Sequence, residues 1–408
     1  MRKVDIIFEE LSMIKISNIR IESGADVSRL TADIDVDGKS APLWFEVEPK
    51  YGKYLTPERC DAYVLAVLHY ALRYGHDIVC DTPMTDRLWD GLCGQFIPAF
   101  QKANSGRCHL VDVKCPLDGE VERIAEKQVV ATGVSCGVDS MHVFAGHADI
   151  THGCIWNGHG RNWDETEEKR EKTWNALVRR AREFTSHLGI ELVVGNSNFD
   201  HGCIPEIMWD GMTTNGNLFC IFALQKLWSK YYVASDCAAD IFRFSIPLDE
   251  DPAHYEFFLF PLVSLPHMQI LMDGADKKRI EKIGELVDYK PAQRFLNTCW
   301  RLSDNHNNCS HECPKCMRTM LGLWCYGALD RFSGVYDVGY FKTHLHEYLA
   351  EVYRGCIHKD FFAVELLPYL KKMDLPMVVK IKAWGIVAKK IVKKALRLGA
   401  VSQEFKSR

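Results

Sequence analysis

The sequence predicts an α/β protein: a parallel sheet with helices on both faces, an N-terminal α+β domain before it, and a zinc-stapled helical region after it. Strand-like apolar runs alternate with helical periods between residues 127 and 272, a pattern typical of βαβ units. A glycine-containing turn at 135–140 joins the first of these runs to a helix. Three of the sixteen cysteines stand close together at 309–316, a spacing typical of a metal site.

The N-terminal region, residues 1–126, reads as an accessory α+β domain. Short alternating runs predict a small antiparallel sheet, at 19–22, 32–36 and 43–47. Two helices and two strands are expected after them, at 57–74, 85–102, 78–80 and 109–113. Thr56 suits the N-cap of the first helix, because its hydroxyl can accept from the free N–H groups, and Pro57 suits the first helical position.

Residues 127–272 carry the alternating pattern. Largely apolar strands are expected at 129–135, 150–156, 190–194 and 231–234. The helices between them are expected from 139, over 166–188 and over 216–228. Apolar strands that alternate with helices predict a parallel sheet covered on both faces. Residues 273–370 read as mostly helical and contain the cysteine group.

A phosphate site is predicted at the strand-to-helix turn Ser135-Cys136-Gly137-Val138-Asp139-Ser140. Such a turn directs consecutive backbone N–H groups at one point, and the helix dipole adds positive charge there. Gly137 allows close approach of a phosphate, and the hydroxyls of Ser135 and Ser140 can donate to it. Asp139 would repel a phosphate unless a cation intervened, which favours Mg²⁺ at this position.

The turn resembles the SGGxDS motif of the PP-loop ATP pyrophosphatases, with Cys136 in place of the first glycine. The resemblance implies an adenine nucleotide alpha hydrolase-like (HUP) fold and an ATP site. Two interpretations of Cys136 are open: a reactive thiol at a helix N-terminus, or a small residue where the site uses only backbone. We prefer the second.

The same resemblance places adenine and ribose across the carboxyl ends of the neighbouring strands, which implies contacts at Ile155, Trp156 and Asn196. It also implies catalytic roles for Asp139 and Ser140, whose replacement by alanine we expect to stop turnover and leave the fold intact. The cations assigned to charge stabilisation are Lys282 and Arg279. Their alternative interpretation, which we favour slightly, is a place on the solvated face of a helix.

A zinc site is predicted from Cys309, Cys313 and Cys316, with Cys299 as the fourth thiolate. The alternative fourth ligands are His306, His311 and Cys325. The cluster resembles that of 7-cyano-7-deazaguanine synthase-like proteins. It also resembles a bacterial PP-loop-like group without an assigned reaction, in which a Cys-Trp pair precedes NCGKCEKCLRT, although the interval from Cys309 to Cys313 is one residue longer here. We expect the zinc to staple helices together and to do no chemistry.

The resemblance implies an ATP-dependent ligase that forms AMP and pyrophosphate. ATP would adenylate a carboxylate, amide or carbonyl oxygen of a small substrate, and a nitrogen nucleophile would then displace AMP. Transfer of sulfur (thiolation) and a non-catalytic nucleotide-binding sensor are the alternatives. The expected cofactors are ATP, Mg²⁺ and Zn²⁺.

Charge and composition concern the partners and the compartment. The absence of a signal-like start, together with clustered cysteines, predicts a reducing cytoplasm. Residues 371–408 hold eleven Lys or Arg and two acids, a net charge of +9, so residues 1–370 carry −13, which argues against nucleic acid as a partner. Residues 377–398 predict a basic amphipathic helix that ends at Gly399. It either packs on the protein or lies on the inner membrane face, and a homodimer is also open.

Overall fold

The computed structural model describes residues 12–119, 121–157, 166–199, 213–245, 253–299 and 308–406, with backbone alone from 394 onward. Two compact units divide the chain. The sheet unit contains residues 1–134 and 147–275. The helical unit contains residues 135–146 and 276–408, so the predicted phosphate-binding turn belongs to the same unit as the predicted zinc region.

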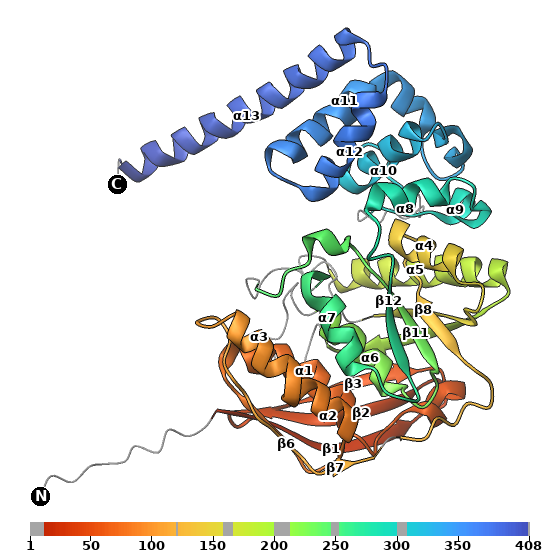
Figure 1. The fold of residues 1–408 in the computed structure, drawn as a ribbon, viewed down its shortest axis with the longest axis vertical. Helices are drawn as coiled ribbons and strands as arrows, with labels where there is room; N and C mark the ends of the chain where they lie inside the picture. Colours follow the sequence, from red (N-terminus) through yellow and green to blue (C-terminus); the bar gives the residue numbers. More distant parts are fainter. Residues whose placement is uncertain are drawn as a thin grey trace, which may run out of the picture. The chain divides into compact units, whose positions relative to one another are not determined.

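One ten-stranded sheet, in the order β12-β11-β8-β9-β10-β3-β2-β1-β4-β6, forms the centre of the sheet unit (Figure 1). Its strands are β1 (Met13–Ser23), β2 (Ser28–Val36), β3 (Lys39–Val47), β4 (Asp77–Cys80), β6 (Val113–Lys114), β8 (Val130–Gly133), β9 (His152–Trp156), β10 (Glu191–Ser197), β11 (Lys230–Ala234) and β12 (Gln269–Asp273). The short strands β5 (Met84–Thr85) and β7 (Leu117–Asp118) form a separate pair. The predicted α/β class with a large, mostly parallel sheet is confirmed.

The sheet crosses the boundary predicted at residue 126. Strands β1, β2 and β3 form the expected antiparallel meander, and β3 pairs antiparallel with β10. Asn198 fastens this junction, because its side-chain oxygen accepts from the Trp44 N–H at 2.8 Å and its amide donates to the Pro42 carbonyl at 2.7 Å. The N-terminal strands therefore extend the parallel sheet, and a separate accessory domain for them stays a prediction.

The parallel half has a topology that the local pattern does not determine. Strands β12, β11, β8, β9 and β10 all pair in parallel. If β8, β9, β10, β11 and β12 are numbered 1 to 5, they lie side by side in the order 3-2-1-4-5. The chain therefore adds strands on one side of β8 first and then, from β11 onward, on the other side. In open α/β sheets the carboxyl ends of the strands at such a reversal are the usual place for a ligand.

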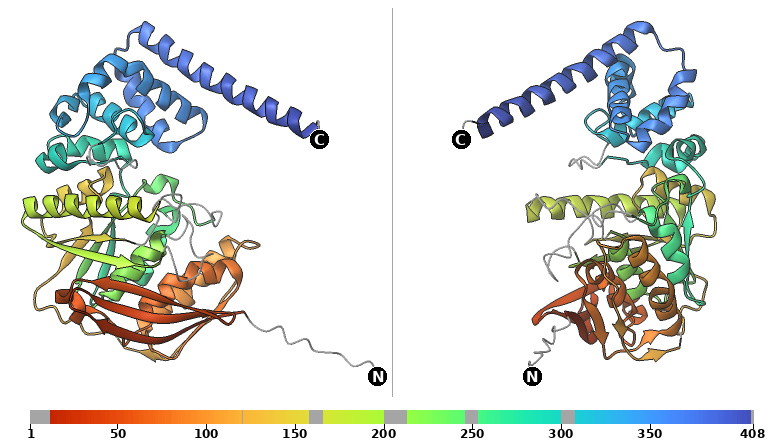
Figure 2. Two further views of the ribbon diagram at one scale, coloured as in Figure 1. Left: turned by 180° about the vertical axis from the view of Figure 1, so that it is seen from behind. Right: turned by 60° about the vertical axis from the view of Figure 1, so that its left-hand side comes forward.

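Helices cover both faces of this half. A Cβ on Gly153 of β9 would lie 2.8 Å from Thr185, so helix α5 (Glu167–Leu188) packs on the face of Gly153 (Figure 2). Trp156 points to the opposite face, because side chains alternate along a strand. There it packs against Phe45, which contacts Phe219 of helix α6 (Thr213–Ala223). Helix α1 (Asp61–Tyr74) packs on α6.

Several predicted boundaries were wrong. Helix α1 begins at Asp61, four residues after Pro57, because the Asp61 carboxylate accepts from the backbone and hydroxyl of Thr85. The helix expected over 85–102 is α2 (Asp86–Gly91), a π-helical turn (Leu92–Phe96) and α3 (Ile97–Ala103), where Pro98 has no N–H to donate. The strand expected at 109–113 forms only at Val113. Helix α7 (Ala253–Val263) and strand β12 were not anticipated.

The helical unit confirms the helical reading beyond residue 273. It holds α4 (Val138–Gly146), α8 (Arg279–Leu286), α9 (Lys290–Phe295), α10 (Pro314–Cys325), α11 (Val338–Ile357), α12 (Phe361–Lys372) and α13 (Met377–Lys406). Helix α4 packs on α8, and α13 on α11. The end predicted at Gly399 was wrong, because α13 continues through it to Lys406.

Candidate phosphate-binding turn and metal centre

The turn at 135–140 follows β8 directly and leads into α4, as predicted. Two hydrogen bonds close it: the Gly137 N–H donates to the Ser135 Oγ at 3.2 Å, and the Ser135 N–H donates to the Ser140 Oγ at 3.3 Å. The two serine hydroxyls therefore brace the turn from inside. Val138 begins α4 as a buried core residue.

Cys136 occupies the left-handed region, with a φ of 57°. Residues with a side chain rarely adopt this conformation, so glycine would fit this position with less strain than cysteine does. The thiol is buried, and the Cys136 carbonyl accepts from the Asn297 N–H at 2.7 Å. Because Asn297 is two residues from Cys299, the turn is hydrogen-bonded to the segment that enters the cysteine cluster.

Two cations of α8 meet the carboxylate of the turn. Arg279 donates to Oδ2 of Asp139 at 2.6 Å, and the Lys282 Nζ lies 3.2 Å from Oδ1. The side chain of Lys282 is only 1% exposed. The solvated-face interpretation of these two residues was therefore wrong. Two cations therefore contact the carboxylate in the first turn of α4, the end of the helix where its dipole places partial positive charge.

Side chains from α12 and α10 complete the surroundings of Arg279. The Arg279 guanidinium lies 4.1 Å from the ring centre of Phe362, and its backbone N–H donates to Glu365 at 3.1 Å. Arg318 stacks on the same ring at 5.1 Å and pairs with Asp360, the N-cap of α12. Arg318, two residues after Cys316, therefore joins α10 to the first turn of α12.

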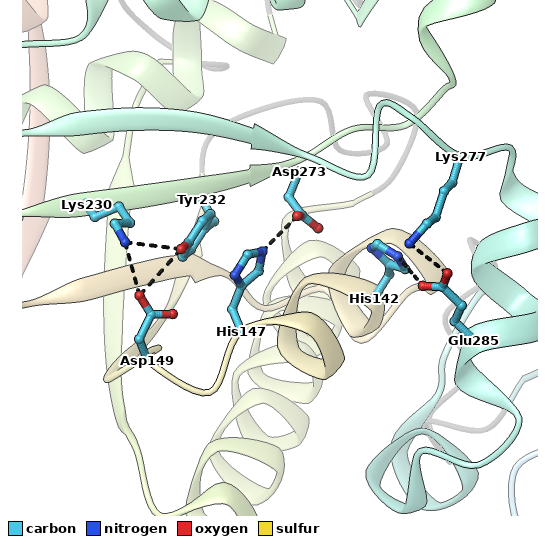
Figure 3. Close-up of polar contacts among 8 residues, drawn as sticks. All are labelled: His142, His147, Asp149, Lys230, Tyr232, Asp273, Lys277 and Glu285. Atoms are coloured by element: carbon cyan, nitrogen blue, oxygen red, sulfur yellow. Dashed lines mark hydrogen bonds and ion pairs between the residues drawn. The ribbon is translucent and has the colours of Figure 1, made fainter.

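A second polar contact fastens α4 to α8. His142 of α4 lies 2.9 Å from Glu285 of α8, and Lys277 lies 2.7 Å from the same carboxylate (Figure 3). Burial raises the pKa of Glu285, but the hydrogen bonds from Lys277 and His142 outweigh it and lower this pKa below its ordinary value of 4.5. Helix α4 is therefore held to α8 by polar contacts at both Asp139 and His142.

The residues predicted to contact adenine and ribose lie in the sheet unit. Ile155 and Trp156 are both buried in β9. The amide of Asn196 donates to Glu46 at 2.9 Å, and its oxygen accepts from Asn157 at 2.9 Å. These bonds link β9, β10 and β3, so the structure gives Asn196 a structural function, and its contact with ribose stays a prediction.

The sheet unit also holds polar contacts that the sequence did not indicate. His147, just after α4, lies 2.8 Å from Asp273 at the end of β12 and stacks on Tyr232 at 3.9 Å (Figure 3). Lys230 of β11 lies 3.1 Å from Asp149, which is two residues after His147. These contacts tie the chain that follows α4 to β11 and β12.

The four predicted cysteines come together. The Sγ atoms of Cys299, Cys309, Cys313 and Cys316 all lie within 4.8 Å of one another, and all four are free thiols. A tetrahedral zinc with Zn–S bonds of about 2.3 Å keeps its sulfurs roughly 3.8 Å apart. The cluster can therefore hold a metal ion such as zinc after a small contraction.

The local fold prepares these thiols for a metal. Cys313 is the N-cap of α10, and its sulfur accepts from the Cys316 N–H at 3.4 Å. The hydrogen bond from Cys299, helped by those from Cys316, lowers the pKa of Cys313, which favours the thiolate that a metal needs. Cys299 is the fourth member of the cluster, whereas His311 stacks on Tyr340 and Cys325 lies at the far end of α10. His306 lies outside the described residues.

Comparison with protein-family models, curated proteins and solved structures finds no match. The chemistry of the chain must therefore be inferred from its own residues.

Asn308 organises the loops around the cysteines, a role that we did not predict. Its side-chain oxygen accepts from the N–H groups of Thr298 and Cys299 at 2.8 and 3.2 Å. Its amide donates to the carbonyls of Leu296 and Val335 at 2.9 and 3.0 Å. The signal was present in the sequence, because Asn308 immediately precedes the cysteine group. A buried amide at this position can hold both ligand-bearing segments.

Replacement of Asn308 by alanine should weaken metal binding about 10- to 100-fold, because four backbone groups around the cysteines each lose a hydrogen bond. Competition with a coloured chelator measures the affinity. Asn308→Asp should recover little of the loss, since a carboxylate cannot donate to the two carbonyls. Asn175→Ala, on the exposed face of α5, is the matched control and should bind metal as the wild type does. An unchanged affinity in Asn308→Ala would contradict the role of Asn308.

Proposed function

We propose that this chain is an ATP pyrophosphatase of the PP-loop type with a HUP fold, which uses ATP to adenylate a small substrate. One observation carries the proposal. Arg279 and Lys282 both contact Asp139, the carboxylate of the turn, so a site with backbone N–H groups at the start of a helix also has two cations beside it. A pyrophosphate group is an anion that such a site suits.

The topology supports this assignment. The order of the parallel strands reverses beside β8, and the turn begins at the carboxyl end of that strand. The last β8 pair along β9 is Gly133 with Cys154. Along a strand, the backbone N–H and C=O groups of successive residues face alternate neighbouring strands. Because the Cys154 carbonyl accepts from Val134 after β8, the backbone N–H and C=O of Trp156 face the same side, beyond the end of β8. This edge is the one we assign to adenine, although the Trp156 side chain is buried in the core.

The proposed reaction has two steps. A substrate oxygen forms a bond to the α-phosphorus of ATP while the bond from that phosphorus to the bridging oxygen breaks, which releases pyrophosphate. A nitrogen nucleophile then bonds to the activated carbon, loses a proton and expels AMP. Arg279 and Lys282 stabilise the charge that accumulates on the leaving pyrophosphate, and the Ser135 and Ser140 hydroxyls keep the turn in shape.

Mg²⁺, when bound with ATP, would neutralise part of the phosphate charge, and Asp139 is the carboxylate of the turn that can face it. In the structure both Asp139 oxygens are engaged by Arg279 and Lys282. Binding of the nucleotide would therefore redistribute these ion pairs, with the two cations moving their hydrogen bonds toward phosphate.

Nitrogen is preferred to sulfur as the second nucleophile. Among the described residues, the closely spaced cysteine pairs of the helical unit belong to the metal cluster, which leaves none of them for a persulfide. The sensor alternative predicts a site for AMP and has less use for two cations at a pyrophosphate position. The zinc is proposed as structural, because four thiolates close the coordination sphere.

Calorimetry with the nonhydrolysable α,β-methylene analogue of ATP, with inorganic pyrophosphate and with AMP tests the proposal. We expect the analogue and pyrophosphate to bind, and AMP to bind at least about tenfold more weakly, because it lacks the group that the turn recognises. Ser140→Ala should lower the affinity for the analogue about tenfold, since the turn loses an internal hydrogen bond. Ser186→Ala, exposed on α5, is the control. Binding of AMP as tight as that of the analogue would favour the sensor, and no binding of either would exclude both.

A further inference from the structure

Between residues 377 and 393, where its side chains are described, helix α13 (Met377–Lys406) buries only a narrow strip of its surface within the helical unit. Ala383 and Val387 are buried, and α13 packs along α11, where Trp384 stacks on Tyr353 at 5.0 Å. Figures 1 and 2 show the second half of α13 extending beyond α11 and α12. The packing interpretation of this helix therefore accounts for one side of it only.

An apolar stripe on another side of α13 stays exposed. Its members are between 49% and 67% exposed: Met377, Val378, Ile381, Trp384, Ile391 and Val392. An α-helix turns about 100° per residue, which places these side chains in one sector, roughly 130° from the line of Ala383 and Val387. A stripe of large apolar side chains in water calls for a surface that covers it.

Lysines border the stripe. Lys382, Lys389 and Lys393 are exposed along one edge, and Lys380 lies on the other. The sequence has no acidic residue between Asp374 and Glu404. The complement of this face is therefore an apolar layer bounded by negative charge.

A second copy of the helix does not meet this requirement. A symmetric pair of helices joined through the stripe would bring the lysines of both copies alongside each other, and residues 377–403 contain no acidic side chain to compensate. An anionic lipid bilayer offers acyl chains below a layer of negative headgroups. None of the helices in the described parts of the chain is long and apolar enough to cross a membrane.

We propose that α13 is an interfacial helix that docks on an anionic membrane surface. The stripe from Met377 to Val392 enters the boundary between headgroups and acyl chains, and the flanking lysines contact the lipid phosphates. Trp384 lies in this stripe, at the level where amphipathic rings concentrate in bilayers. This inference is independent of the proposed ATP chemistry.

Co-sedimentation of the full chain with lipid vesicles tests the proposal. Vesicles of phosphatidylcholine with phosphatidylserine should pellet the protein, whereas phosphatidylcholine alone should not, and high salt should reduce the bound fraction. The double variant Ile381→Gln, Ile391→Gln should lower partitioning on the order of thirtyfold, because two large apolar groups leave the interface. Its circular dichroism should match that of the wild type, since both side chains are exposed in the fold.

The matched control changes two similarly exposed apolar residues of the same unit that lie off α13: Ile357→Gln with Val364→Gln. It should bind vesicles as the wild type does. Equal recovery of the wild type in the supernatant with both vesicle types would overturn the proposal, as would equal binding to neutral and anionic vesicles. A dimer in sedimentation velocity that the Ile381→Gln, Ile391→Gln variant loses, without vesicle binding, would show that a second copy covers the stripe.

Discussion

Replacement of Cys313 by serine is expected to abolish metal binding and to unfold much of the helical unit. The wild-type chain should contain about one zinc ion. Cys313 has two functions: it is one of four thiols within 4.8 Å, and its sulfur caps the first turn of α10. Structural zinc contributes roughly 10 kcal/mol or more to the folding of small metal-bound domains. Loss of this free energy should exceed the stability that the packing of the short helices provides, so the helices should unfold.

The measurements are elemental analysis and thermal unfolding followed by circular dichroism, for the wild type, for the wild type with chelator and for Cys313→Ser. Helicity should fall in both perturbed samples. Cys325→Ser is the matched control, because Cys325 ends the same helix, α10, and is not a member of the cluster. It should retain zinc and unfold near the wild-type temperature. A Cys313→Ser protein with full zinc content and unchanged unfolding would refute the metal centre.

Replacement of Asp139 by alanine is expected to reduce the free energy of unfolding by about 3–5 kcal/mol, the usual effect of breaking a buried ion pair. The nearly fully buried Lys282 would lose the carboxylate that it faces, and Arg279 would lose the same partner. The position of the turn alone had suggested that Asp139→Ala leaves the fold intact. The ion pair with Lys282 changes this expectation.

Lys282→Met should cost less, because Asp139 keeps Arg279 and the methionine fills a similar volume. The double variant Asp139→Asn, Lys282→Met should recover most of the stability lost in Asp139→Ala. Asp288→Ala removes the exposed partner of Arg331 and is the control, with a change below about 1 kcal/mol. Denaturant unfolding gives these values. A loss in Asp139→Ala no larger than that in Asp288→Ala would contradict the buried pair.

These stability values are separate from the proposed activity. If the ATP analogue binds the wild type, Lys282→Met should bind it about 100-fold more weakly, because a cation at the pyrophosphate position is lost. If the ion-pair energetics hold but neither nucleotide nor pyrophosphate binds, the pair is structural and the PP-loop assignment is wrong. The two measurements therefore distinguish failure of the function from failure of the geometry.

Local patterns in the sequence determined most elements of the sheet. Apolar runs bounded by turns gave the positions of β8, β9, β10 and β11, because a buried parallel strand must be apolar on both faces. The helix expected over 166–188 is α5, which lies between the caps Thr166 and Gly189, and capping is a local interaction. The spacing of three cysteines indicated a metal cluster, and Cys299 was chosen because four thiolates close a tetrahedral site.

Only the tertiary structure decided which distant segments meet. Residues far apart in the chain meet in three places: β3 pairs with β10, Lys282 is buried against Asp139, and the Asn308 amide donates to the carbonyls of two loops. A charged residue in a predicted helix is expected to face solvent unless an oppositely charged partner is known. The burial of Lys282 was missed for this reason, because its partner Asp139 is far away in the sequence. For α13 the sequence determined a basic amphipathic helix, and the structure decided which apolar side chains α11 covers and which remain exposed. The physical reason is the same in each case: periodicity and caps act within a few residues, whereas burial depends on neighbours that only the folded chain brings together.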